Sequence, residues 1–271
     1  MNSTSGHDMT GHDGHTGHGG ARPGGLSVSE SGYTLELDAT VLPAGTQTVT
    51  FRITGPDGLS VTEYEPEHEK ELHLIAVRRD TTGFQHVHPV RDGNGVWSVG
   101  LTLTPGDWRI FADIHPAGHD GTLTLGVDAA VAGPYDPQPL PGDTRTAHLG
   151  EYAVTLDGGL VPGAASDLTL TVTRDGRPVT DLQPYLGAYG HLVALRAGDL
   201  GYLHVHPEGE PGDGATEPGP EIIFMAAAPT AGTYRLYLDF QHDDAVRTAE
   251  FTLRATTSAA PAHPSHHHGH H

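Results

Sequence analysis

Two short segments of the sequence carry histidines at a spacing that can chelate a metal ion. Each reads His-Val-His-Pro, at residues 86–89 and again at residues 204–207. Residues two apart in a β-strand project from the same face, so both imidazoles of a segment can point at one position. Proline cannot donate a hydrogen bond to a neighbouring strand, so each segment should end its strand at the rim of a sheet. A rim site is open to dissolved ions.

Each segment has one further histidine upstream, with twelve residues between them. The first of these lies in ELHLIAVRR, residues 71–79, and the second lies at the matching place in the other half of the chain. The intervening turn is short enough for a β-hairpin, which would bring three imidazoles together. An aspartate near the end of a later strand can add an oxygen. The candidate ligands are His73, His86, His88 and Asp113 in the first half, and His191, His204, His206 and Asp239 in the second.

Three nitrogens and one carboxylate suit Cu²⁺ or Zn²⁺ and are too nitrogen-rich for Ca²⁺ or Mg²⁺. The chain has no cysteine and only three methionines, which disfavours a Cu(I) site. Because Cu²⁺ leads the divalent affinity order, we expect copper first and zinc second. Binding should weaken as the pH falls, since a protonated imidazole cannot ligate.

Other roles for these side chains stay open. A single histidine in a strand is commonly a half-buried polar residue, and an aspartate after a strand often caps a turn or pairs with an arginine such as Arg109 or Arg235. Three classes of function therefore compete: a protein that sequesters or relays metal, a metalloenzyme of superoxide-dismutase-like or hydrolytic type, and an adhesion or structural module. The recurrence of the triplet favours the first, which needs no turnover. His68 has no counterpart in the second half and is interpreted as a surface residue.

The elements that would position these residues are strands. Short alternating runs rich in Val, Thr, Ile and aromatics are separated by Gly and Pro turns, and no run keeps a helical period over three turns. The fold class is therefore all-β.

The chain also repeats itself. Residues 32–45 match 151–164, residues 71–89 match 189–207, and residues 106–114 match 232–240. Units of about 105 to 110 residues with about seven strands predict a tandem pair of immunoglobulin-like or cupredoxin-like β-sandwiches. The expected division is a disordered His- and Gly-rich tail at 1–25, a domain at 26–131, a proline-rich linker at 132–147, a domain at 148–256 and a His-rich tail at 257–271.

The tails hold ten of the 21 histidines and would raise the local metal concentration. The final HHHGHH is either a native metal-binding tract or a variant purification tag. The net charge of −20 disfavours nucleic acid as a partner. No apolar run has the length of a membrane span, and the composition of the N-terminal tail is typical of segments that follow a lipid anchor. We expect an extracytoplasmic protein, secreted or lipid-anchored, with metal ions and a metal transporter or another metal-binding protein as candidate partners.

Two resemblances add to these expectations. The string KELHLIAVRRD with FQHVHP, followed by GDWRIFAD, resembles a recurrent segment of poorly characterised bacterial secreted or lipid-anchored proteins that accompany copper and heavy-metal systems. It implies that the histidines and aspartate within it are signature positions. GFQHVH, residues 83–88, is also similar to the His-x-His strand of copper-zinc superoxide dismutases. Those enzymes need a further histidine cluster in a long loop and usually a disulfide, and this sequence has neither.

Overall fold

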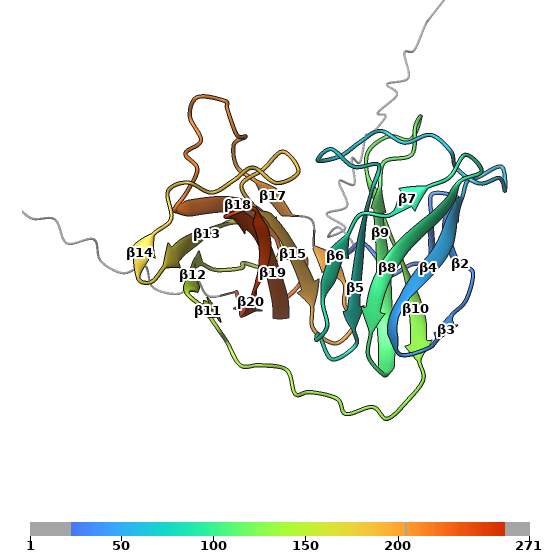
Figure 1. Ribbon diagram of the computed structural model, residues 1–271, viewed down its shortest axis with the longest axis horizontal. Coiled ribbons are helices and arrows are strands. Elements are labelled where there is room, and N and C mark those ends of the chain that lie inside the picture. Colours follow the sequence, from blue (N-terminus) through green and yellow to red (C-terminus); the bar gives the residue numbers. More distant parts are fainter. Residues whose placement is uncertain (1–22, 204, 258–271) are drawn as a thin grey trace, which may run out of the picture.

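The computed structural model describes residues 23–203 and 205–257. All regular elements in these ranges are β-strands, and they form two β-sandwich domains that lie side by side (Figure 1). The expected all-β class and the two tandem domains are confirmed. Within the same ranges, no helix is present that could cross a membrane. The tail histidines fall outside the described residues, as does His204.

The first domain consists of two five-stranded sheets. Its strands are β1 (Ser29–Glu30), β2 (Tyr33–Leu37), β3 (Val41–Leu42), β4 (Gly45–Thr54), β5 (Leu72–Arg78), β6 (Gln85–Val87), β7 (Val90–Arg91), β8 (Val96–Leu103), β9 (Gly106–Ile114) and β10 (Leu123–Val131). One sheet has the order β1-β2-β4-β8-β7 and the other β3-β10-β9-β5-β6. Phe51 and Trp97 from the first sheet share one buried core with Leu74 and Trp108 from the second.

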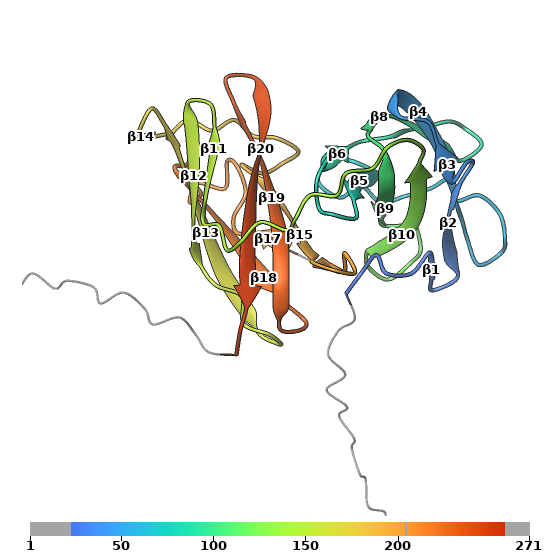
Figure 2. The same cartoon turned by 90° about the horizontal axis from the view of Figure 1, so that it is seen from below.

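The second domain repeats this plan. Its strands are β11 (Thr146–Leu149), β12 (Tyr152–Gly158), β13 (Ala165–Arg174), β14 (Arg177–Pro178), β15 (His191–Arg196), β16 (Tyr202–Leu203), β17 (Val205–Pro207), β18 (Glu221–Ala227), β19 (Gly232–His242) and β20 (Ala245–Ala255). One sheet has the order β11-β12-β13-β18-β17, with β14 on β13, and the other β16-β15-β19-β20. Residues 132–143 contain no strand and join the domains as an extended segment (Figure 2).

The two domains pack through the outer faces of their β5 and β15 sheets. Ile75 and Val77 on β5 belong to one buried cluster with Val193 and Leu195 on β15. On β5 the alternate residues, among them Leu74, enter the core of their own domain. Because both faces of β5 are covered, the strand is buried at almost every position. Its nearly continuous apolar sequence is typical of a strand in such a place.

Equivalent residues of the two repeats occupy equivalent places in this interface. Phe84 stacks on Tyr237, with ring centroids 4.0 Å apart, and the Tyr237 hydroxyl donates a hydrogen bond to the Thr81 carbonyl. Tyr202, which corresponds to Phe84, contacts Phe111, which corresponds to Tyr237, with centroids 5.7 Å apart. The repeats are therefore related approximately as the subunits of a two-fold dimer.

Residues 23–25, assigned to the tail by composition, lie in the structure between the domains. Gly24 forms a two-way backbone bridge with Tyr202 of the second domain. The Gly25 amide donates to the Thr124 carbonyl, and the Arg109 guanidinium donates to the Gly25 carbonyl. This short segment thus ties the two sandwiches together at one side of their interface.

Candidate metal centre

The predicted hairpin around the first His-Val-His segment is present. Strand β6 pairs antiparallel with β5, with His86 opposite Ile75. On the other side of β5, His73 lies opposite Asp113 of β9. The hairpin therefore brings the upstream histidine next to the His-Val-His pair.

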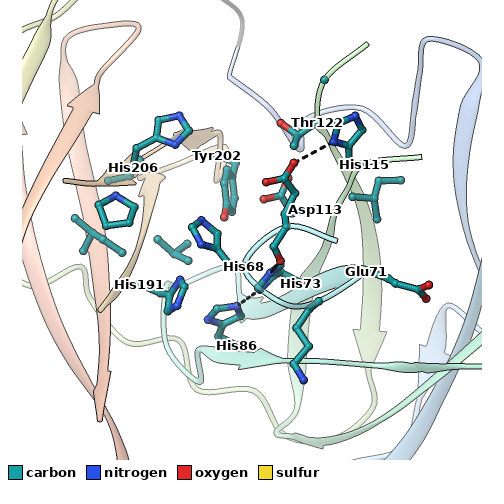
Figure 3. A pocket seen from close by; sticks show the side chains of 18 residues that line it. His68, Glu71, His73, His86, Asp113, His115, Thr122, His191, Tyr202 and His206 are labelled. Atoms are coloured by element: carbon teal, nitrogen blue, oxygen red, sulfur yellow. Dashed lines mark hydrogen bonds and ion pairs between the residues drawn. The ribbon is translucent and has the colours of Figure 1, made fainter. Parts of the chain in front are cut away.

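Three ring nitrogens of the first repeat, from His73, His86 and His88, converge at this edge. Figure 3 shows two of these side chains, His73 and His86. Nδ1 of His73 lies 3.1 Å from Nε2 of His86 and 3.2 Å from Nε2 of His88. Four-coordinate zinc binds imidazole nitrogen at about 2.0–2.1 Å, which places neighbouring ligand atoms of a tetrahedron about 3.3 Å apart. The observed separations are close to that value. The triad could hold a metal ion.

The partners of the outer nitrogens determine which inner nitrogens carry a lone pair. Nε2 of His73 is 2.9 Å from the Glu67 carbonyl oxygen, which can only accept, so Nε2 carries the hydrogen and Nδ1 is bare in the neutral ring. Nδ1 of His86 is 2.9 Å from a carboxylate oxygen of Asp239, so we assign the hydrogen there and leave Nε2 bare. Nδ1 of His73 and Nε2 of His86 then lie 3.1 Å apart with their lone pairs facing each other. A cation between them satisfies both nitrogens.

Burial keeps the His73 and His88 imidazoles neutral. It lowers the pKa of His73 to about 3, with the neighbouring imidazoles of His86 and His88 lowering it further. Burial likewise lowers the pKa of His88 to about 4, helped by His86 and Lys70. Because only the neutral ring can ligate, these two side chains are prepared for a metal ion at neutral pH without a competing proton.

The two aspartates lie near the triad but have other contacts. Asp239 binds His86 and also accepts a hydrogen bond from the Thr248 hydroxyl. Asp113 accepts one from Thr124 at 2.9 Å, and burial raises the pKa of its carboxyl to about 6. In the part of the chain that is described, the group of ligand atoms within 4.8 Å of one another contains neither aspartate.

The second repeat orients its upstream histidine in the same way as the first. Nε2 of His191 is 2.8 Å from the Tyr185 carbonyl, six residues upstream, as Glu67 is six residues upstream of His73. Burial lowers the pKa of His191 to about 4. Its ring faces the first repeat, with its centroid 6.4 Å from that of His73 and 6.2 Å from that of His86.

The second His-Val-His segment runs differently from the first. Its hairpin with β15 is limited to β16, and Val205–Pro207 pairs instead with β18 of the other sheet, where His206 lies opposite Met225. His206 is exposed at the edge of the cavity described next (Figure 3). The structure thus brings His73, His86 and His88 together and adds His191 and Asp239 from across the interface.

A cavity of about 320 Å³ lies between the domains beside the triad. His73, His86 and Asp113 line it from the first domain, and His191 and Tyr202 line it from the second (Figure 3). His68, interpreted from the sequence as a surface residue, also lines it, with its ring centroid 5.0 Å from that of His191. The structure places His68 in the turn at residues 67–70, directly before the His73 strand, and its position five residues before His73 is the sequence signal that could have identified it.

Comparisons with known proteins identify a domain but no activity. A family model described as "Domain of unknown function (DUF8832)" matches residues 27–131 and again residues 146–257. No curated protein matches the sequence.

Several solved structures are similar in part. A DUF4426 family protein from Pseudomonas aeruginosa has 12% identity and a TM-score of 0.29, over 41% of this chain and 94% of that one. The D0-D1 domain of intimin has 15% identity and a TM-score of 0.22, over 81% and 96%. Fibronectin(III)-like modules of Clostridium thermocellum CbhA have 10% identity and a TM-score of 0.22, over 88% and 100%.

Proposed function

The chain belongs to the family described as "Domain of unknown function (DUF8832)" and contains two copies of that domain. From the geometry of the histidine triad we propose that it binds a divalent transition-metal ion at His73, His86 and His88. The observation that supports the proposal is the contact between Nδ1 of His73 and Nε2 of His86 at 3.1 Å. Both nitrogens are bare once their outer partners are satisfied. A metal ion is the ligand that two converging lone pairs, with a third imidazole beside them, fit best.

A purely structural role for these histidines accounts less well for the contact. Buried polar atoms are normally paired donor to acceptor, because an unsatisfied buried group costs about 1–3 kcal/mol. The outer nitrogens of His73 and His86 follow that rule. A hydrogen on Nε2 of His88 would satisfy Nδ1 of His73, but Nε2 of His86 still faces that same Nδ1, which carries no hydrogen. The triad therefore has the arrangement of a ligand set more than that of a hydrogen-bonded core.

Cu²⁺ and Zn²⁺ are the two ions that suit an all-nitrogen triad. The affinity order favours Cu²⁺. The nitrogen separations of 3.1 and 3.2 Å are nearer to the tetrahedral value of about 3.3 Å than to the value of about 2.8 Å expected for square-planar ligands, which favours Zn²⁺. Competition between the two ions for one protein sample would establish the preference.

The physiological role that we propose is sequestration or relay of this ion outside the cytoplasm. The histidines of the two terminal tails would collect metal, and the open cavity beside the triad would allow exchange with a transporter or another metal-binding protein. Fractionation of the source cells tests the location. Recovery of the protein in the cytoplasmic fraction would contradict this part of the proposal.

The test of the site is a metal titration of a version spanning residues 23–257, which removes the tail histidines as competing ligands. We expect about one equivalent of Zn²⁺ or Cu²⁺ per chain to resist dialysis, and most of it to be lost in His86→Ala/His88→Ala. His148→Ala is the control, because this exposed histidine lies in β11, outside the cavity lining. Retention below about 0.2 equivalents by the parent, or unchanged retention by the double variant, would refute the assignment.

A further inference from the structure

One carboxylate crosses from the second domain to the metal centre of the first. Asp239 Oδ2 lies 2.9 Å from Nδ1 of His86, and the two side chains are 6% and 4% exposed. Asp239 lies on β19, opposite His191 of β15, whereas His86 lies on β6. The contact joins residues 153 positions apart and lies within the interface between the repeats.

The second domain holds this carboxylate in a fixed position. Asp239 lies opposite Thr248 in the pairing of β19 with β20, and the Thr248 hydroxyl donates to its other oxygen. The second domain thus supplies one hydrogen-bond donor to Asp239, the Thr248 hydroxyl, and the first domain supplies the other, Nδ1 of His86. A buried carboxylate needs donors on both oxygens, so separation of the domains would leave one oxygen without its protein partner.

The contact between Asp239 and His86 also determines the tautomer of the His86 ring. With its Nδ1 hydrogen bonded to a carboxylate, the ring is held in the tautomer whose Nε2 lone pair points at Nδ1 of His73. A carboxylate behind a ligating imidazole also raises the basicity of the ligating nitrogen. Loss of such a partner typically weakens metal affinity 10- to 100-fold.

We propose that Asp239 is a positioning residue for the metal centre of the first repeat, so that metal binding at the triad and the packing of the two domains stabilise each other. This inference rests on the proposed function. A bound cation withdraws charge from the His86 ring and strengthens its hydrogen bond to Asp239. By thermodynamic linkage, the packing that delivers Asp239 must raise the metal affinity by the same factor.

Two substitutions at Asp239 separate charge from hydrogen bonding. Asp239→Asn keeps an acceptor for the His86 hydrogen and removes the charge, whereas Asp239→Ala removes both. We expect Zn²⁺ affinity to fall roughly tenfold in the first and up to about 100-fold in the second. The visible spectrum of bound Co²⁺ should shift in both variants, because the ligand field that the His86 nitrogen exerts on the ion changes.

Tyr237→Phe is the matched control. It removes an interdomain hydrogen bond from the same strand, to the Thr81 carbonyl, without touching the triad. Zn²⁺ affinity and the Co²⁺ spectrum should stay as in the parent, because the apolar cluster still holds the domains together. Hydrogen exchange over residues 81–88 and 232–242 should slow on Zn²⁺ addition in the parent, and by less in Asp239→Asn.

The outcomes distinguish this inference from the function on which it rests. If the parent binds neither Zn²⁺ nor Cu²⁺, the proposed function is wrong. If the parent binds and Asp239→Asn has the same Zn²⁺ affinity and the same Co²⁺ spectrum, Asp239 is only a structural residue and the positioning role is refuted. The near-isosteric asparagine gives this answer even if Asp239→Ala does not fold.

Discussion

At the scale of single residues, the triad depends on the outer contacts of two imidazoles. The Glu67 carbonyl and the Asp239 carboxylate each hold one ring nitrogen and leave the other directed at the centre. The convergence of His73 with His86 and His88 could be predicted from the sequence. The outer partners could not, because one is a backbone atom in a turn and the other comes from the second repeat.

The buried histidines also predict how the metal-free protein responds to acid. Burial lowers the pKa of His73 to about 3 and of His88 and His191 to about 4, whereas in the unfolded chain each titrates near 6.5. Between about pH 6.5 and pH 4 the unfolded chain therefore binds protons that the folded protein excludes. Stability should be lost as the pH falls through this range, with a slope of up to about 1.4 kcal/mol per pH unit from His73 alone.

Urea unfolding of metal-free protein at a series of pH values measures this effect. Burial raises the pKa of Asp113 to about 6, so protonation of this carboxyl in the folded protein stabilises it as the pH falls from about 6 to about 4. This single group opposes three histidines, so the net effect of acid should still be a loss of stability. His73→Gln should flatten the profile. Equal stability of the parent at pH 7 and pH 4.5 would contradict the pKa directions on which the expectation rests.

At the scale of elements, the tight turn before each upstream histidine strand supplies the orienting carbonyl. Residues 67–70 and 185–188 form equivalent turns closed by paired backbone hydrogen bonds. The central positions have positive φ, which favours glycine. The second repeat has Gly187 there, at φ 74°, whereas the first has Glu69, at φ 65°.

This difference predicts opposite effects of substitution in the two turns. Glu69→Gly relieves a left-handed residue and should stabilise the protein by about 0.5–1 kcal/mol, whereas Gly187→Ala should destabilise it by about 1 kcal/mol or more. Denaturant unfolding of the two variants measures both changes. Glu69→Gly should keep its metal affinity, because the Glu67 carbonyl still faces His73. Destabilisation by Glu69→Gly would count against the turn as described.

The two His-Val-His strands show what similar sequences leave undetermined. The hairpin of β5 and β6 followed from a short turn between two alternating runs. In the second repeat the same motif leaves its hairpin earlier and joins β18, ahead of a longer loop at residues 208–220. Strand pairing at a rim depends on the connection that follows, which local spacing does not encode.

At the scale of the whole molecule, the duplication and the all-β class could be predicted from the sequence, but the packing of one repeat on the other could not. Alternation on β5 identifies two faces, and both are largely apolar. It does not reveal what covers the outer face. Because that cover is the second repeat, the triad described in the first half has partners from both repeats. The expected site of the second half includes His204, which lies outside the described residues, and stays a prediction.

The interface should hold the domains together without the linker. An engineered protease site within residues 136–141, which are exposed and carry no strand, allows the linker to be cut in the folded protein. The two halves should then elute together in size-exclusion chromatography at micromolar concentration. Phe84→Ala with Tyr237→Ala should weaken this association, because it removes the stacked pair. Separation of the cut parent would show that the packing depends on the tether.

The near two-fold relation between the repeats has a further consequence. Phe84 on Tyr237 and Tyr202 on Phe111 use the same two patches in both directions, as in an isologous interface. Such an interface is closed: once both patches are matched, neither is left to recruit another molecule. A short tether gives the matching patch an effective concentration of about a millimolar. Pairing within one chain should therefore outcompete exchange between chains, and the Asp239 contact to His86 would not depend on how much protein a cell makes.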